Sequence, residues 1–222
     1  MNFSDYPLQV PLRDRTKVTV RQMEAKDGPA VLEFFRALPE EDRLFLRDDV
    51  TSPEWLKRFV AEIDYVTMIP IVAEQNGKVV GNAALYRSRR GWSAHVGEIR
   101  VAVARAYQRK GLGTVLAREL VKLATNAGLE KMVASVVDNQ VGAKRAFEKL
   151  GFRAEAVLKG HVKDVHGTKR DLVLMANDVS HIWESMESMM QDYSPSAEKI
   201  PPRSSEHWSA PLSQLAPDAS GG

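Results

Sequence analysis

Gln-Arg-Lys-Gly-Leu-Gly-Thr, residues 108–114, lies between an alternating apolar run and a strongly amphipathic helical pattern. Gly111 and Gly113 let the backbone approach a ligand without interference from a Cβ atom. The helix behind them directs unpaired N–H groups and the positive end of its dipole at an anion. The spacing differs from a Walker loop, which ends in Gly-Lys-Ser/Thr, and from the three-glycine dinucleotide fingerprint. It therefore predicts a phosphate-binding loop of another kind.

The flanks of this loop predict a strand, a helix and a second strand. Apolar residues alternate with others before the loop, at Ile99, Val101 and Val103. After the loop, apolar residues recur at helical spacing at Leu116, Leu120, Leu123 and Ala127. Residues 131–137 then read Lys-Met-Val-Ala-Ser-Val-Val, a β-rich run. The order indicates a right-handed crossover unit with the anion site at its carboxyl edge.

A second motif, Ala-Lys-Arg-Ala-Phe-Glu-Lys-Leu-Gly-Phe, occupies residues 143–152. Its small and apolar residues form one helical face, Gly151 lies where a left-handed C-cap is expected, and Phe152 can fold back onto the helix end. In this order and separation, the two motifs resemble those of the GNAT-superfamily N-acetyltransferases. Residues 34–47 are also similar to the corresponding segment of bacterial protein lysine acetyltransferases.

The resemblance covers roughly residues 17–178. It implies an α+β fold with a mixed, mostly antiparallel central sheet that is flanked by helices and splayed where acetyl-CoA binds. Independent local patterns agree with that order of elements. They are an alternating strand at 18–23, helix starts near Asp27-Gly-Pro and Ser52-Pro-Glu, a hairpin turn at Asn76-Gly77, and a last hairpin around His166-Gly167.

The domain organisation follows from these limits. Residues 1–16 are expected to be a lead segment, and residues 17–178 a single GNAT domain. Residues 179–193 carry apolar positions at helical spacing and predict a short amphipathic helix. Residues 194–222 are rich in Ser, Pro, Ala and Gly, with little to bury, and predict a disordered tail.

Composition excludes several classes of function. The chain has no cysteine, which rules out disulfides, thiolate metal sites and a cysteine-bound acyl intermediate. The net charge is +2 and no arginine-rich stripe is interleaved with aromatics, so nucleic acid is not an expected partner. The histidines lack ligand spacing, so no metal is expected. No apolar run is long enough for a membrane span or a secretory signal, and the expected location is cytoplasmic.

The resemblance assigns the cofactor contacts, with acetyl-CoA as co-substrate. The backbone of Val101, Ala102 and Val103 would pair with the pantetheine arm, and the Val103 N–H would polarise the thioester carbonyl. The pyrophosphate would be held by Arg109, Lys110, Gly111, Leu112, Gly113 and Thr114. The family's usual asparagine falls on Gln140, one position from Asn139. Either amide could reach the pantetheine arm, and Asn139 is slightly favoured.

Glu98 is the candidate catalytic base. A lysine-like amine has a pKa of about 10.4 and must lose a proton before it attacks. Glu98 precedes the loop in a Gly-Glu-Ile-Arg-Val-Ala-Val stretch that resembles the lysine-acetylating branch, in which a Glu at this point acts as base. An equally weighted alternative is a solvent-facing Glu paired with Arg100. Many family members carry a tyrosine where Phe147 stands, and its hydroxyl protonates the departing thiolate, which phenylalanine cannot do.

The expected acceptor is a primary amine, either a lysine side chain or a small polyamine-like molecule. Acidic residues are frequent in the connection at residues 39–54, and such a patch attracts cations, although acids in loops more often only solubilise. The alternative function is a catalytically silent acyl-CoA-binding regulatory module, favoured by Phe147. A homodimer is compatible with the sequence as well.

Overall fold

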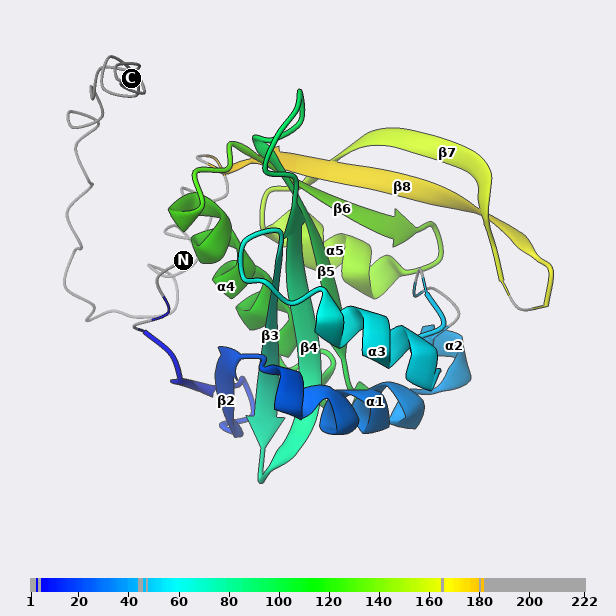
Figure 1. Ribbon diagram of the computed structural model, residues 1–222. Helices are drawn as coiled ribbons and strands as arrows, with labels where there is room; N and C mark the ends of the chain where they lie inside the picture. Colours follow the sequence, from blue (N-terminus) through cyan, green and yellow to red (C-terminus); the bar gives the residue numbers. More distant parts are fainter. Residues whose placement is uncertain are drawn as a thin grey trace, which may run out of the picture.

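The computed structural model describes residues 3, 5–43, 46, 48–164, 166–179 and 181 of the chain. These residues form an eight-stranded sheet with the strand order β1-β2-β3-β4-β5-β6-β8-β7 (Figure 1). The strands are β1 (Leu8–Pro11), β2 (Lys17–Gln22), β3 (Met68–Gln75), β4 (Lys78–Arg87), β5 (Val96–Val103), β6 (Lys131–Val137), β7 (Arg153–Lys163) and β8 (Lys169–Asp178). Among the described strands, β5 and β6 are parallel and the other neighbours are antiparallel. This is the mixed, mostly antiparallel sheet that the sequence predicts.

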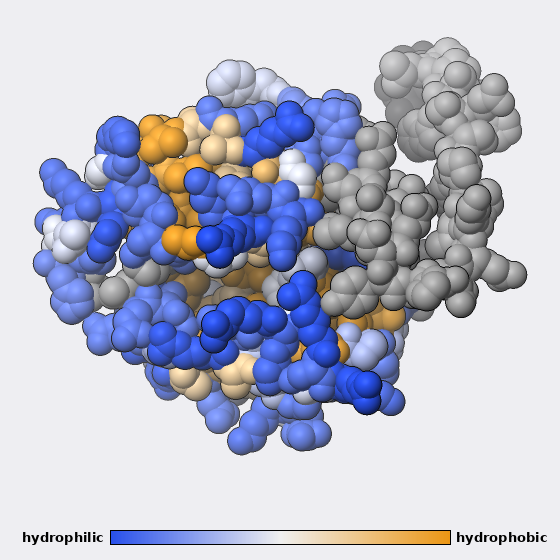
Figure 2. Space-filling view, turned by 180° about the vertical axis from the view of Figure 1, so that it is seen from behind, coloured by the Kyte–Doolittle hydropathy of each residue, from blue (hydrophilic) through white to orange (hydrophobic). Residues whose placement is uncertain are grey.

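Helices cover both faces of the sheet, with α1 and α3 on one side and α4 and α5 on the other (Figure 1). The described helices are η1 (Ala25–Asp27), α1 (Gly28–Ala37), α2 (Glu40–Arg43), α3 (Pro53–Ala61), η2 (Arg105–Tyr107), α4 (Leu112–Asn126) and α5 (Val141–Lys149). Figure 2 shows the molecule from behind, where hydrophilic residues predominate and apolar residues gather in a hollow across the middle.

Two hydrophobic clusters hold these layers together. One lies between the sheet and α4 and contains Leu116, Leu120 and Phe152. The other lies under α1 and α3 and contains Trp55, which stacks on Phe59 with ring centroids 4.7 Å apart. Burial of each such side chain contributes about 1.5–3 kcal/mol to folding. The sheet is therefore anchored on both faces, and its central strands have a fixed position.

Local signals in the sequence account for several element ends. The hydroxyl of Ser52 accepts the Trp55 N–H at 2.9 Å and caps α3. Asn76 and Gly77 have φ values of +50° and +75°, as the hairpin between β3 and β4 requires. Gly151 has a φ of +82° and ends α5, which confirms the predicted left-handed cap, and the Phe152 N–H reaches back to the Phe147 carbonyl at 3.0 Å.

The N-terminal residues differ from expectation. The lead segment at residues 1–16 contains β1, which pairs antiparallel with β2 and so extends the sheet. Val10 and Leu12 are buried in the core cluster next to α4, which explains why this short strand is held in place. The sequence pattern predicts a domain that begins at residue 17 and does not predict this strand.

The last hairpin is longer than expected, and most of the predicted C-terminal segments lie outside the described residues. Strands β7 and β8 are both longer than the expected hairpin segments at 159–165 and 172–175. The predicted helix at 179–193, of which only Val179 and His181 are described, and the predicted disordered tail at 194–222 lie outside the described residues. In the described part of the chain, no helix is long and apolar enough to cross a bilayer.

Candidate active site

The two central strands β5 and β6 separate along their length. Their parallel register joins Val96–Glu98 to Lys131–Val133, while β5 continues to Val103 and β6 to Val137. On its other side β5 remains paired with β4 as far as Val103. The β6-facing edge of β5 beyond Glu98 therefore carries backbone groups that are outside the β5–β6 ladder and available to a ligand strand or arm. This is the splay that the resemblance implies.

A cavity of about 430 Å³ occupies this gap. One wall is formed by aromatic side chains from α1 and α3, namely Phe35, Trp55 and Phe59. The remaining walls come from β4, β5, β6, α5 and β7. The predicted cofactor residues Val101 and Ala102 line it, together with the predicted base Glu98. The structure thus brings the end of β5 and the candidate base to one site.

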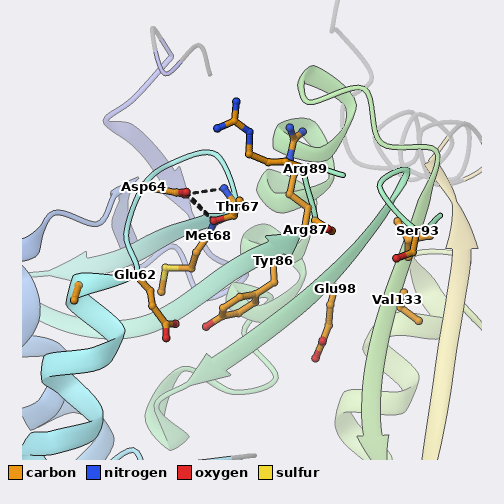
Figure 3. Close-up of a pocket in the computed structure, with 13 residues that line it drawn as sticks. Glu62, Asp64, Thr67, Met68, Tyr86, Arg87, Arg89, Ser93, Glu98 and Val133 are labelled. Carbon is orange, nitrogen blue, oxygen red and sulfur yellow. Dashed lines mark hydrogen bonds between the residues drawn. The ribbon is translucent and has the colours of Figure 1, made fainter. Parts of the chain in front are cut away.

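Glu98 lies beside the side chains of Tyr86 and Arg100. Its Cα is aligned with that of Tyr86 on β4, and Figure 3 shows the two side chains projecting together from neighbouring strands. The Nε of Arg100 lies 3.2 Å from Oε1 of Glu98, and the Arg100 guanidinium lies 4.3 Å from the centroid of the Tyr86 ring. Burial raises the pKa of Tyr86 above its ordinary value, although the nearby Arg100 opposes this.

A second cavity of about 860 Å³ opens onto the same two residues, Tyr86 and Glu98 (Figure 3). Asp64 lies on its wall and accepts hydrogen bonds from the Thr67 hydroxyl at 2.7 Å and the Met68 N–H at 3.1 Å. Burial opposes ionisation of Asp64, but these donors outweigh it and hold its pKa well below its usual range. Asp64 is thus an anchored carboxylate, and Glu98 is the acid that both cavities share.

The predicted phosphate loop forms the start of α4. Arg109 and Gly111 have φ values of +61° and +96°, and Gly111 is the N-cap of the helix. Gly111 has no side chain with which to cap this end, and the first turn of α4 holds no acidic residue. The N–H groups of the first turn, at Leu112, Gly113 and Thr114, have no acceptor inside the helix, which is the arrangement that binds anions at helix starts. Leu112 is fully buried and belongs to the core cluster between the sheet and α4.

The turn between β1 and β2 braces this loop, which the sequence analysis did not anticipate. The Arg13 N–H donates to the Lys110 carbonyl at 3.0 Å, and Nζ of Lys110 pairs with Asp14 at 2.8 Å. The Arg13 side chain lies 3.8 Å from the position that a Cβ on Gly111 would take. The Lys110 side chain is therefore held by Asp14 in the present arrangement. In the sequence, the apolar residues Val10 and Leu12 before this turn are a signal that it packs on the domain.

Of the two amides suggested for the pantetheine arm, Gln140 lies at the cavity and Asn139 does not. Gln140 lines the cavity, and its Oε1 accepts the Val137 N–H at 3.0 Å. Asn139 is exposed in the preceding turn and is not part of the cavity wall. Phe147 lines the cavity as well, and its ring packs on Phe152 with centroids 5.2 Å apart.

The acidic connection between α1 and α3 makes ion pairs and a hydrogen bond with β5 and with residues beside the phosphate loop. Asp48 lies 3.6 Å from Arg100, and Glu41 lies 3.3 Å from Arg105. The Gln108 amide donates to Asp42 at 3.2 Å. These acids therefore fasten the connection to β5 and the phosphate loop, and part of their charge is compensated. Over the residues that the structure describes, no group of three or more His, Asp or Glu side chains could hold a metal ion.

Comparisons with known proteins agree with this geometry. Residues 32–152 match the family model described as the acetyltransferase (GNAT) family. The Bacillus subtilis protein named uncharacterized N-acetyltransferase CgeE is 25% identical over 131 residues, and the match covers 57% of this chain but only 46% of that protein. The putative phosphinothricin acetyltransferase YwnH of the same species is 20% identical over 165 residues, which covers 73% of this chain and 100% of that protein.

Solved structures share the fold. YncA, a putative acetyltransferase from Salmonella typhimurium whose structure contains acetyl-CoA, has a TM-score of 0.63 and 26% identity, and covers 73% of this chain and 94% of its own. The GNAT domain of S. lividans PAT has a TM-score of 0.65 and 20% identity, and covers 77% of this chain and 96% of its own.

Proposed function

This chain belongs to the acetyltransferase (GNAT) family, and we propose that it transfers the acetyl group of acetyl-CoA to a primary amine with Glu98 as base. The observation that carries the proposal is the position of Glu98. It stands at the point where β5 and β6 separate, on the walls of both cavities. A base there adjoins the edge of β5 that is proposed for the cofactor and can be reached by an acceptor from either cavity.

The residues present fit acetyl-CoA. The uncapped start of α4 offers backbone N–H groups to a pyrophosphate, and Gly111 supplies the left-handed conformation that turns the chain into the helix. The gap between β5 and β6 leaves Val101, Ala102 and Val103 with an edge free to pair with a pantetheine arm. We retain Arg109, Lys110 and Asn139 as proposed contacts, and add Gln140 because it lines the cavity.

The chemistry requires no covalent enzyme intermediate. The acetyl thioester supplies an electrophilic carbon, which the amine nitrogen attacks as the carbon–sulfur bond breaks. Glu98 accepts the proton that the amine must lose, directly or through a water molecule. Arg100 pairs with the Glu98 carboxylate, and its guanidinium in turn lies over the Tyr86 ring.

The leaving thiolate needs no strong acid. A thiol has a pKa of about 8.5, so its anion is a tolerable leaving group at neutral pH. Phe147 has no proton to donate, and water in the cavity serves instead. The aromatic wall formed by Phe35, Trp55 and Phe59 limits how much water enters.

The acceptor class that the sequence suggests is a lysine side chain or a small polyamine-like amine. One similar protein is named a putative phosphinothricin acetyltransferase, which extends the candidates to small amino compounds. The absence of cysteine fits a cytoplasmic enzyme, which is the location we propose.

Release of free thiol from acetyl-CoA tests this function. Lysine peptides, polyamines, free amino acids and aminoglycosides are supplied in turn, and mass spectrometry identifies the acetylated product. Thermal shift with acetyl-CoA runs alongside. Thiol release with one amine class supports the enzyme, while stabilisation by acetyl-CoA without release from any amine favours the silent acyl-CoA-binding module.

A further inference from the structure

A β-bulge interrupts β7 next to the active-site cavity. The register of β7 against β8 shifts between Leu158 and Val162, and Gly160 within this stretch has a φ of +57°. Asp171 on β8 fixes the irregularity, because its Oδ1 accepts the Gly160 N–H at 2.9 Å and its Oδ2 pairs with Nζ of Lys159 at 2.6 Å. A bulge held by a specific partner redirects the side chains that follow it.

The residues after the bulge reach the cavity. His161, Val162 and Lys163 line the same 430 Å³ cavity as Glu98. In Figure 1, β7 and β8 form a long arm that curves over this side of the molecule. The bulge therefore adds an imidazole and an ammonium group to a site whose other walls come from the central strands and from α1, α3 and α5.

The charged side chains that line this cavity are two carboxylates, Asp48 and Glu98, and two cations, Arg100 and Lys163. Asp48 and Glu98 both lie beside the guanidinium of Arg100. Within the described residues, Lys163 forms no ion pair with any carboxylate. Lys163 is thus a positive group on the cavity wall without a matched acid, and the imidazole of His161 stands two residues away with an N–H to donate.

We propose that the acceptor is a small amine that carries an anionic group of its own, such as a free amino acid. Lys163 and His161 bind the anionic group, while the amine faces Glu98. This rests on the proposed acetyl transfer and narrows its substrate. Lys163 and His161 are exposed side chains on the cavity wall, so an incoming anionic group can reach both and form a charge-assisted hydrogen bond with Lys163. A polyamine, in contrast, would place a second cation against Lys163.

Matched acceptor pairs test the proposal. Methionine and glutamate are compared with methioninamide and glutamic diamide, and putrescine and a lysine peptide are included. Because the amides have a lower amine pKa, rates are compared at equal concentrations of unprotonated amine. We expect kcat/KM for the amino acids to exceed that for their amides by about tenfold or more, since a hydrogen bond to a charged group is lost in the amide.

Variants locate the effect. Lys163→Gln should remove most of the preference for the anionic acceptor, mainly through KM, and Lys163→Glu should shift the preference towards putrescine. His161→Gln should reduce the preference for the anionic acceptor in part. Lys169→Gln is the matched control, because Lys169 is the register partner of Lys163 on β8 but does not line the cavity. Equal kcat/KM for acid and amide, or a best rate with the lysine peptide, would overturn the proposal.

Binding separates this proposal from the proposed function. N,N-dimethylglycine cannot be acetylated, so its binding to the CoA-loaded protein is measured by calorimetry against N,N-dimethylglycinamide. Tighter binding of the acid that disappears in Lys163→Gln supports the anion site even if no amine is acetylated, in which case only the transfer activity fails. Equal binding of the two compounds in a protein that acetylates amines contradicts the anion site alone.

Discussion

Glu98 on β5 and Val133 on β6 are the last aligned pair of the two strands before they separate. The parallel ladder therefore ends at the residue that also reaches both cavities. The β5–β6 ladder fixes the backbone of Glu98, and beyond it the two strands separate. The geometry gives the base a rigid support and the acceptor an open approach.

Gly111 is expected to govern cofactor affinity through its backbone. Its φ of +96° is strained for any residue with a Cβ, by about 1–2 kcal/mol, whereas the added atom would meet only the Arg13 side chain at 3.8 Å. Gly111→Val should distort the start of α4 and weaken acetyl-CoA binding by about tenfold or more, measured by calorimetry. Gly128→Val is the control, since Gly128 has a φ of +70° beyond the other end of α4. The control should lose similar stability but keep its affinity, and equal affinity losses in both would argue against a phosphate loop.

Restoring a phenol at Phe147 should accelerate turnover. Phe147 lines the cavity and is held against Phe152, so a tyrosine there would present its hydroxyl near the departing sulfur. We expect Phe147→Tyr to raise kcat by up to about 10²-fold, the lower end of the range for general acid–base catalysis, with little change in affinity for acetyl-CoA. Stopped-flow thiol release measures the effect. A fall in kcat in a variant of unchanged melting temperature would show that the ring edge does not face the sulfur.

The carboxylate of Asp171 should matter for acceptor selection through the bulge. Asp171→Ala removes the partner of both Lys159 and the Gly160 N–H, so His161 and Lys163 should lose their fixed position. The KM for an anionic acceptor should rise several-fold, while the KM for acetyl-CoA stays constant. Glu155→Ala removes a comparable ion pair, with Lys131, at the other register shift of β7, between Ala154 and Ala156, and should leave both values unchanged.

Acid stability should depend on Asp27. Arg21 forms a bidentate pair with Asp27 and also bonds Glu74, joining β2, β3 and the start of α1. Burial raises the pKa of Asp27, but the Arg21 guanidinium and the Glu24 N–H outweigh burial and leave it below its usual value. The stability gained from a lowered carboxyl pKa is present above about pH 4, the unfolded value, and is lost as pH falls through the folded pKa.

Asp27→Asn should accordingly lower the free energy of unfolding by about 2 kcal/mol at pH 7, and the difference from the wild type should shrink below pH 4. Urea denaturation at pH 7, 5 and 3 provides the measurement. Lys26→Gln breaks only the exposed pair with Glu24 and should leave the free energy of unfolding nearly unchanged, because solvent screens exposed ion pairs. A pH-independent loss in Asp27→Asn would mean that the carboxylate charge is not the cause.

Much of the fold could be predicted because its signals are local. The loop at 108–114, the cap at Ser52, the turn at Asn76-Gly77 and the helix end at Gly151 each depend on residues next to one another. Strand β1 was missed because it has only four residues, too few for the alternation of Leu8 and Val10 to stand out, and it is stabilised by pairing with β2 and packing against α4. The bulge in β7 depends on Asp171, which lies on another strand, and no local pattern reveals it.

The site was predictable to a similar extent. The position of Glu98 before the loop marked it as a candidate, but its place between two cavities depends on how β4, β5 and α3 pack. The acids at residues 39–54 predicted a patch that attracts cations. Asp48 and Glu41 are partly neutralised by Arg100 and Arg105, whose positions only the folded chain defines. His161 and Lys163 were not predicted, because nothing in the sequence shows that they line the same cavity as Glu98.

Thiol release by Glu98→Gln, compared with the wild type and with Glu33→Gln, tests the central claim most directly. Glu33 is exposed on α1 and lines neither cavity, so its variant controls for the loss of a charge. The account predicts that Glu98→Gln binds acetyl-CoA with unchanged affinity but loses at least about 10²-fold in kcat near neutral pH, with part of the rate recovered at a pH where the amine is already deprotonated. Full activity of Glu98→Gln at neutral pH would contradict the role of Glu98 as the base.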